Sequence, residues 1–246
     1  MWLKIFVLSV LFLHCSFAQI EKLYPSPCHE LVKHTYYILS YNETHEQADW
    51  VFYLLTKDMP SSKYDRTNFK TDNLVSTGSA QYKDYTNSKF ARGHLCPAED
   101  MSWDSLAIDE TFYMSNMAPQ KQNFNAGIWK KLETKVRNWA INEDSLYVIS
   151  GGILKPGLKK IGKKNKVSVP TEFFKVIVSL KENNIKGIAF LVPNKKSTKD
   201  IFSYAVSIDS LENQTGIDFF AGLPDSTQKQ FESDASITQW RLLRKK

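Results

Sequence analysis

The sequence predicts an α+β fold, in which a mixed sheet forms the core and one strand-to-helix region carries the chemistry. Short runs of aromatic and β-branched residues recur along the chain between turn-forming residues, which is typical of strands. One longer segment, residues 126–141, has apolar residues at helical spacing. Because strands precede and follow this helix, a mixed α+β domain around a sheet is the expected architecture.

The predicted strands form an early pair and a later group of three. The early runs, 35–41 and 50–55, are joined by a loop. The later runs are 146–150, 173–178 and 187–192. Turn residues stand on both sides of each run, so each is short enough to be one strand of a sheet.

The clearest helix, residues 126–141, has its apolar positions at Ile128, Leu132, Val136, Trp139 and Ala140. We predict a shorter helix near 206–214, closed by Gly216, and another in the C-terminal segment that begins at Ser226. Residues 19–33 are predicted to be a loosely packed lead-in. Residues 60–90 are predicted to be a long structured loop that leads into the site.

The composition bounds the number of domains. With 246 residues, 42% of them hydrophobic, the chain can bury one sizeable core, so residues 19–246 are predicted to be a single domain. Residues 1–18 are predicted to be a secretory signal peptide. Lys4 precedes an apolar run at residues 5–13, and the run is too short for an ordinary membrane span.

The predicted location is therefore secreted or periplasmic, with cleavage after Ala18. A lipoprotein attached through Cys15 is the less favoured alternative, because His14 stands where a small residue is expected. No later segment is apolar enough to span a bilayer, so we expect no membrane span. The remaining cysteines, Cys28 and Cys96, either form a disulfide or stay unpaired, and the sequence leaves both alternatives open.

The formal net charge of +6 fits attraction to a polyanion and fits an ordinary basic secreted protein equally well. Six lysines lie within residues 155–166, a segment that contains Gly and Pro. A solvated loop is favoured there over a dedicated nucleic-acid contact. Charge alone therefore does not identify the partner.

Arg92-Gly93-His94 carries residue types suited to phosphodiester hydrolysis. An arginine offers a planar set of donors for phosphate, and a histidine titrates near working pH and can act as a general base. The glycine permits unusual backbone angles or the close approach of a phosphate. A histidine before an apolar residue is by itself more often structural, and the adjoining Arg-Gly reverses that preference.

Asn125 stands just before the predicted helix 126–141, and Glu133 lies eight residues further on, inside the helix. The ordinary role for Asn125 is an N-cap, but its carbonyl oxygen also suits a hard metal ion, and magnesium keeps several waters beside few protein ligands. Glu133 lies about 12 Å further along the helix at ~1.5 Å per residue. Direct ligation of one ion by both is therefore disfavoured, and we predict that Glu133 holds a metal-bound water.

A series of segments in order resembles the DNA/RNA non-specific endonuclease family of the ββα-metal superfamily, which includes secreted bacterial nucleases and endonuclease G. The similarity covers most of residues 35–222. It is carried by Arg66-Thr67-Asn68-Phe69-Lys70-Thr71-Asp72, Arg92-Gly93-His94, Asn116-Met117-Ala118-Pro119-Gln120, Asn125 to Glu133, Pro170 to Lys175, and Thr215 to Phe220.

The resemblance implies a ββα-metal finger active site and a sugar-non-specific endonuclease that cuts DNA and RNA and leaves 5′-phosphate ends. It implies His94 as general base, Asn125 as ligand of Mg²⁺ (with Mn²⁺ as an alternative), and Arg66 and Arg92 as catalytic, substrate-binding residues. Asn116 would support the geometry of the site. A homodimer and an inhibitor protein are expected as partners besides the substrates.

Ala91 departs from the family pattern, which usually has Asp at this position. We therefore expect an altered rate or metal preference. The alternative function is a catalytically weakened nucleic-acid-binding member of the same fold.

Two other enzyme classes fit the sequence less well. A zinc hydrolase built on His29, His34 and His45 lacks the usual ligand spacing, so these are predicted to be surface or strand-edge histidines. Glu99-Asp100 suggests the carboxylate pair of a glycosidase, but adjacent side chains point apart. We predict that they contact solvent or backbone in a loop.

Overall fold

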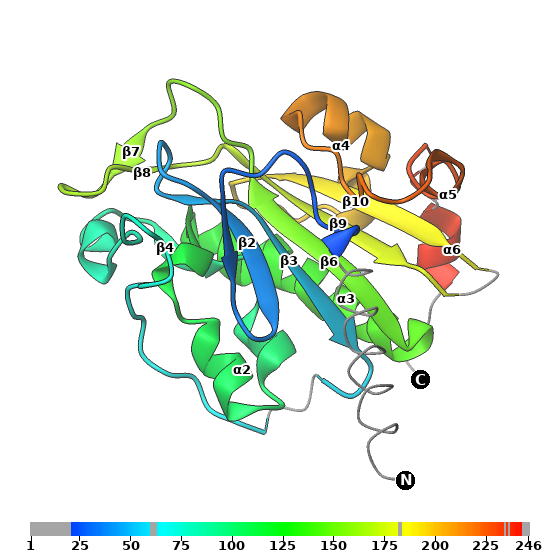
Figure 1. The fold of residues 1–246 in the computed structure, drawn as a ribbon, viewed down its shortest axis with the longest axis horizontal. Helices are drawn as coiled ribbons and strands as arrows, with labels where there is room; N and C mark the ends of the chain where they lie inside the picture. The colour runs from blue at the N-terminus through cyan, green and yellow to red at the C-terminus, as the bar shows by residue number, and fades with distance from the viewer. Residues whose placement is uncertain (1–20, 60–62, 182–183, 234, 236, 243–246) are drawn as a thin grey trace, which may run out of the picture.

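The structure is a computed structural model that describes residues 21–59, 63–181, 184–233, 235 and 237–242. The predicted signal peptide lies outside the described residues. The α+β class is confirmed, and the core is a seven-stranded sheet of order β1-β2-β3-β6-β9-β10-β11 whose recorded pairs are all antiparallel rather than mixed (Figure 1). The strands are β1 (Glu30–Lys33), β2 (Tyr37–Asn42), β3 (Gln47–Thr56), β6 (Ser145–Gly152), β9 (Glu172–Ser179), β10 (Lys186–Pro193) and β11 (Ala205–Val206).

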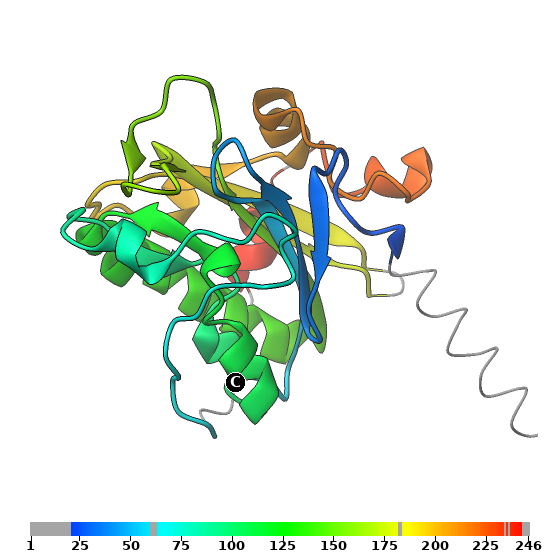
Figure 2. The same ribbon diagram turned by 60° about the vertical axis from the view of Figure 1, so that its left-hand side comes forward.

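The central sheet is buried on both faces. Because successive side chains of a strand point to opposite sides, one strand contributes residues to both faces. In β3, Val51 and Tyr53 belong to one hydrophobic cluster and Phe52 to another. The first cluster includes residues of α3 (Lys130–Glu143), and the second includes residues of α4 (Ile208–Thr215). The two helices therefore cover opposite faces of the sheet (Figure 2).

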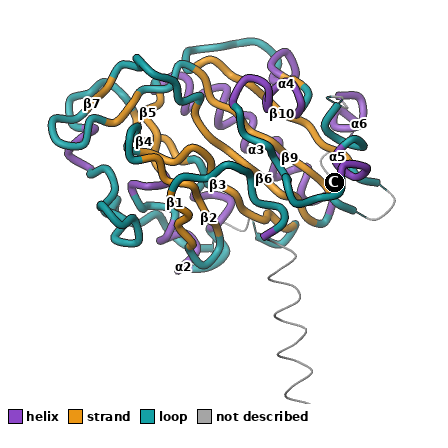
Figure 3. Tube along the Cα trace, turned by 45° about the horizontal axis from the view of Figure 1, so that its top comes forward, coloured by secondary structure: helices purple, strands orange, loops and turns teal. Residues whose placement is uncertain are grey.

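A second, two-stranded sheet pairs β4 (Ala91–His94) with β5 (Met117–Gln120) and lies outside the central sheet (Figure 3). After β5 the chain enters a π-helical turn, η4 (Phe124–Trp129), which continues into α3. These elements make the ββα unit. The segment between the two strands contains η2 (Ala98–Met101), α2 (Ser105–Glu110) and η3 (Met114–Asn116).

The five predicted strands and the two internal helices are confirmed, with small shifts of their ends. The shorter helix, α4, is followed by Gly216 in the left-handed region at φ 71°, as a terminating glycine requires. The C-terminal segment contains α5 (Asp225–Gln228) and α6 (Ile237–Leu242). The remaining elements are η1 (Tyr82–Tyr85), the hairpin of β7 (Lys160–Ile161) and β8 (Val167–Ser168), and η5 (Ile201–Tyr204).

The expectation of a loosely packed lead-in was wrong. The lead-in contains strand β1, which pairs with β2, so it is part of the sheet. The strands β4 and β5 and the helix α2 were not predicted, because each spans six residues or fewer and lacks a clear apolar period. Cys28 is exposed and Cys96 is buried, and both thiols are free, so no disulfide joins them.

Candidate active site

One cleft of about 490 Å³ lies between the loop that precedes β4, the β4 strand itself and the first turns of α3. It is lined by all of the predicted site residues except Asn116, namely Arg66, Arg92, His94, Asn125 and Glu133. These residues are far apart in the sequence, and the ββα unit brings them together. In this unit β4 pairs with β5, and the chain that follows β5 forms α3 beside the cleft. Four further residues line the cleft that the sequence motifs did not assign to the site, namely Phe69, Glu99, Lys130 and Arg137.

His94 is the last residue of β4 and pairs with Met117 across the small sheet. Its ring packs against Phe112, with the centroids 5.0 Å apart, and against Phe69 at 5.9 Å. Its Nε2 atom is buried and has no hydrogen-bond partner among the described residues. Burial, and then the positive charge of Arg66, lower the pKa of His94 to about 3. The imidazole is therefore neutral near pH 7, as a general base must be.

Arg92 lies over two aromatic rings. Its guanidinium carbon is 4.1 Å from the centroid of the Tyr82 ring and 4.9 Å from that of Phe69. Such cation–π contacts help to hold the guanidinium group in place without using its N–H donors. Arg66 is exposed on the preceding loop and lines the same cleft, so two guanidinium groups converge there.

Asn125 does not have the ordinary N-cap role. Asn125 lies inside the π-helical turn, where its backbone N–H donates to the carbonyl of Lys121 at 3.0 Å, and Asn123 precedes that turn. Its side chain is partly exposed in the cleft and makes no hydrogen bond within the described part of the chain. The amide oxygen is consequently available to a ligand. π-Helical turns occur frequently at functional sites.

Glu133 follows on α3 and is partly buried at the same cleft. Burial raises the pKa of Glu133 to about 7, although the nearby charge of Lys175 acts to lower it. Lys175 is fully buried in the middle of β9, where it donates to the hydroxyl of Ser150 and lies 4.9 Å from the ring of Trp129. A lone lysine within the apolar run 173–178 was the sequence signal for this buried cation.

Asp100 is a further buried charged residue near Lys175 and Glu133. The prediction that it contacts solvent or backbone is wrong, because it is fully buried and accepts from the Tyr53 hydroxyl at 2.8 Å and from Arg137 at 2.7 Å. Burial raises the pKa of Asp100 even though Arg137 acts to lower it. Arg137 therefore links the cleft wall to the buried Asp100 carboxylate, and Lys175 is a second buried charge near Glu133.

Asn116 is fully buried and does not line the cleft. Its amide oxygen accepts from the Cys96 N–H at 2.8 Å, and its amide nitrogen donates to the carbonyls of Cys96 and Thr111, each at 2.9 Å. It joins the segment just after His94 to the turn before β5. This geometry suits a positioning residue rather than a group that touches substrate.

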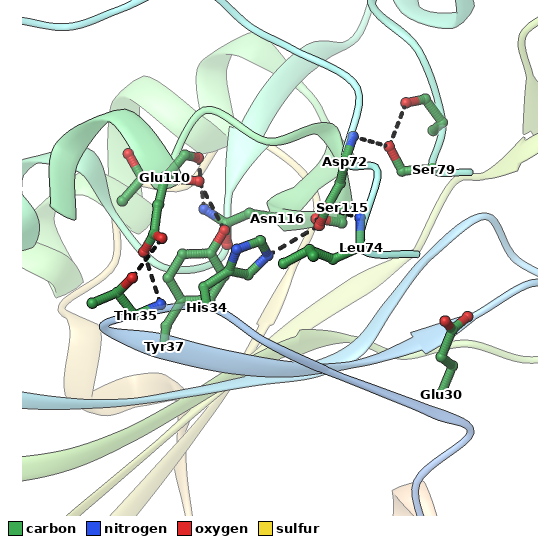
Figure 4. Close-up of polar contacts among 12 residues, drawn as sticks. Glu30, His34, Thr35, Tyr37, Asp72, Leu74, Ser79, Glu110, Ser115 and Asn116 are labelled. Carbon is green, nitrogen blue, oxygen red and sulfur yellow. Dashed lines mark hydrogen bonds and ion pairs between the residues drawn. The ribbon is translucent and has the colours of Figure 1, made fainter. Parts of the chain in front are cut away.

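The three histidines of the zinc alternative lie on separate partners. His29 pairs with Asp49 at 2.6 Å, and His45 contacts the Ser168 hydroxyl at 2.8 Å. His34 is not a surface residue: it is buried and its Nε2 lies 3.0 Å from Asp72 (Figure 4). Within the described residues, the one His, Cys, Asp and Glu cluster close enough to share a metal ion contains no histidine, so the zinc alternative has no support.

The donors in the cleft fit a hard divalent cation. Asn125 offers a neutral amide oxygen and Glu133 a carboxylate, while no thiol lines the cleft as far as the structure describes it. Hard ions such as Mg²⁺ and Mn²⁺ prefer oxygen ligands and complete their shells with water. The donor types alone do not discriminate between these two ions.

A ββα unit that gathers a neutral histidine, two arginines and amide and carboxylate oxygens in one cleft is the arrangement expected of a phosphodiester hydrolase. In agreement, residues 18–226 match the family described as DNA/RNA non-specific endonuclease, and the chain belongs to that family. The family consists of hydrolytic endonucleases.

Individual relatives agree with this assignment. The chain is 34% identical over 218 residues to the mitochondrial nuclease EXOG of Danio rerio, covering 82% of this chain and 62% of that protein. It is 31% identical over 221 residues to a nuclease of Serratia marcescens, covering 84% and 80% of the two chains. The EndoG chain of an EndoG/EndoGI complex superposes with a TM-score of 0.75 at 31% identity, covering 82% of this chain and 89% of that one.

This chain spans 62% of the length of the zebrafish relative, which is a mitochondrial nuclease. Across the described residues, no helix combines the length and apolar character needed to cross a membrane.

Proposed function

We propose that this protein is a metal-dependent endonuclease that hydrolyses phosphodiester bonds of DNA and RNA with little sequence or sugar preference and leaves 5′-phosphate ends. The observation that carries the proposal is the cleft in which neutral His94 meets Arg66, Arg92 and the unbonded amide of Asn125. Pure binding of nucleic acid requires cations but not a neutral base beside a hard oxygen ligand.

In the proposed reaction, His94 accepts a proton from the attacking water. Arg92 and Arg66 hold the phosphate and stabilise the negative charge that develops on its oxygens. A hard divalent cation, Mg²⁺ or alternatively Mn²⁺, held by Asn125 would neutralise charge on the phosphate and on the leaving oxygen. Glu133 orients a water beside Asn125, and Asn116 keeps the end of β4 in place.

The proposed lack of specificity follows from the residue types in the cleft. Arginines and lysines recognise phosphate, which DNA and RNA share, whereas specificity requires contacts to base edges or to the 2′-hydroxyl. Lys130 adds a further cation to the cleft wall. The alternative function, a catalytically weakened nucleic-acid-binding protein, is motivated by Ala91, which pairs with Gln120 in the β4–β5 sheet.

Digestion of plasmid DNA and of total RNA by purified residues 19–246 tests the proposal. Both substrates should be degraded with Mg²⁺ and remain intact with a chelator, and end-labelling should find 5′-phosphates. His94→Ala should reduce turnover by at least about 10²-fold while nucleic-acid binding persists. His45→Ala is the matched control, because His45 lies outside the cleft. Binding without cleavage by the unmodified chain would instead support the alternative function.

Asn125→Ala tests the metal role separately. It should raise the Mg²⁺ concentration needed for half-maximal cleavage as well as lower the maximal rate. A variant with a lower rate and unchanged metal dependence would remove Asn125 from the proposed metal site.

We also propose that residues 1–18 are a secretory signal peptide and that 19–246 form one domain. Expression in a secreting host followed by N-terminal sequencing tests the first statement, because the mature chain should begin at Gln19. A single cooperative unfolding transition of residues 19–246 is the expected result for the second. Homodimerisation and an inhibitor protein stay proposals as well. The EndoG relative was solved in complex with EndoGI, which motivates the second.

A further inference from the structure

Three carboxylates converge on the side of the central sheet that faces away from the catalytic cleft. Asp209 and Glu212 lie on α4, and Glu232 follows α5. One oxygen of each lies within 4.8 Å of the others. None of the three lines the cleft of His94.

The fold brings these side chains together through fixed backbone contacts. Asp209 and Glu212 are three residues apart on one helix and so share a face. Phe231 is buried in the same hydrophobic cluster as Ile208, which anchors its neighbour Glu232 against α4. The Asp209 N–H also donates to the Glu232 carbonyl at 3.2 Å.

Nothing in the described chain neutralises the cluster, because no Lys, Arg or His nitrogen is within ion-pair distance of these three carboxylates. Glu232 is only 5% exposed, and its Oε1 is buried without a hydrogen-bond partner in the described residues. An acidic residue in the first turn of a helix is ordinary, which accounts for Asp209. It does not account for Glu232, since an unpaired buried carboxylate oxygen is strongly destabilising.

We propose that Asp209, Glu212 and Glu232 bind one Ca²⁺ ion that ties α4 to the C-terminal segment. Calcium takes six to eight oxygens at about 2.3–2.6 Å, so oxygens on opposite sides of one ion lie roughly 5 Å apart. The observed separations satisfy this limit with the backbone in place. An all-carboxylate set at a partly open surface suits calcium, which accepts irregular geometry and completes its shell with water. The role is structural and separate from the proposed catalysis.

A shared proton is the competing way to neutralise the cluster. Burial, and then the charge of Glu212, raise the pKa of Glu232 to about 8. A protonated Glu232 would lessen the repulsion but would give the protein no response to calcium. The two arrangements are therefore distinguished by adding the ion.

The test is calcium titration calorimetry and thermal unfolding of metal-free residues 19–246. The measurements use the Asn125→Ala background, so that binding at the catalytic cleft is removed. Saturating CaCl₂ should bind with one equivalent and raise the melting temperature by about 2–4 °C. Glu232→Gln should abolish both effects. In the presence of chelator, this variant should have a higher melting temperature than the Asn125→Ala parent, because it lacks the buried charge. Asp58→Asn, at an exposed acid elsewhere, should keep the calcium response.

Asp209→Asn is a second variant at an exposed position, so it carries the test if Glu232→Gln fails to fold. The proposal is overturned if calcium neither binds the parent nor changes its melting temperature, or if the folded Asp209 or Glu232 variant responds like the parent. Calorimetry and thermal unfolding do not depend on nuclease activity, so the outcome of this test is independent of the proposed function.

Discussion

The side chain of Gln120 occupies the space that a Cβ on Gly93 would need. A Cβ built on Gly93 would lie 2.1 Å from both Cδ and Oε1 of Gln120. Gly93 does not have a positive φ, so this contact, and not an unusual backbone angle, explains the glycine within the described site. Gln120 is fully buried, so its side chain cannot move aside without displacing its neighbours.

Gly93→Ala should therefore lower the free energy of unfolding by about 1–3 kcal/mol through overpacking. It should also reduce kcat, because the residue adjoins His94. Chemical denaturation and plasmid digestion measure the two effects. Adding Gln120→Ala makes room for the new methyl group and should restore part of both, and a double variant no better than Gly93→Ala would contradict this explanation.

The buried pair of Asp72 and His34 makes stability depend on pH at the acidic end. Burial acts to raise the pKa of Asp72, but hydrogen bonds from His34 and Ser115 outweigh it and hold the pKa below its usual value. The stabilisation is thus fully present above the unfolded pKa of about 3.9 and is lost as the pH falls through the lower folded value.

Asp72→Asn should lower the free energy of unfolding at pH 7 by about 2–3 kcal/mol, because it removes the charged acceptor of the buried hydrogen bonds from His34 and Ser115. Denaturant unfolding between pH 7 and pH 2 should show the difference from the unmodified protein shrinking below about pH 4. A difference that stays constant over this range would show that the charge of Asp72 is not responsible.

Arg137 is the partner of the buried Asp100 carboxylate. Arg137→Met should cost about 3–5 kcal/mol of unfolding free energy, since it leaves that carboxylate with the Tyr53 hydroxyl alone. Lys131→Met, at an exposed position of the same helix, should change stability by less than about 0.5 kcal/mol. Adding Asp100→Asn to Arg137→Met should recover part of the loss, and no recovery would argue against an uncompensated charge as its cause.

Asn116→Ala removes three buried hydrogen bonds and should cost about 2–4 kcal/mol of unfolding free energy. Because Asn116 holds the segment after His94, kcat should fall about tenfold or more while KM for DNA stays near its original value. Steady-state kinetics at a temperature where the variant is folded separates the two constants. A raised KM with unchanged stability would instead assign Asn116 to substrate binding.

Hydrophobic patterning was sufficient to predict the elements that build the central sheet. The run 173–178 and its neighbours are apolar enough to require burial, and the period of residues 126–141 fixes the face of α3 that packs on the sheet. These are local properties of the chain, so they are visible in the sequence. The resemblance of ordered motifs similarly placed Arg66, Arg92, His94, Asn125 and Glu133 in one site, and all five line one cleft.

Local sequence patterns and the ordered motifs were enough to predict the α+β class, the main strands and helices, and five residues that line one cleft. The roles that depend on partners distant in the chain became visible only in the folded molecule. Asn116 became a buried link, Gly93 made room for Gln120, and Asp100 gained Arg137. The physical reason is that burial, pKa and hydrogen bonding are set by neighbours in space, and residues 37 positions apart such as Asp100 and Arg137 carry no local sign of meeting.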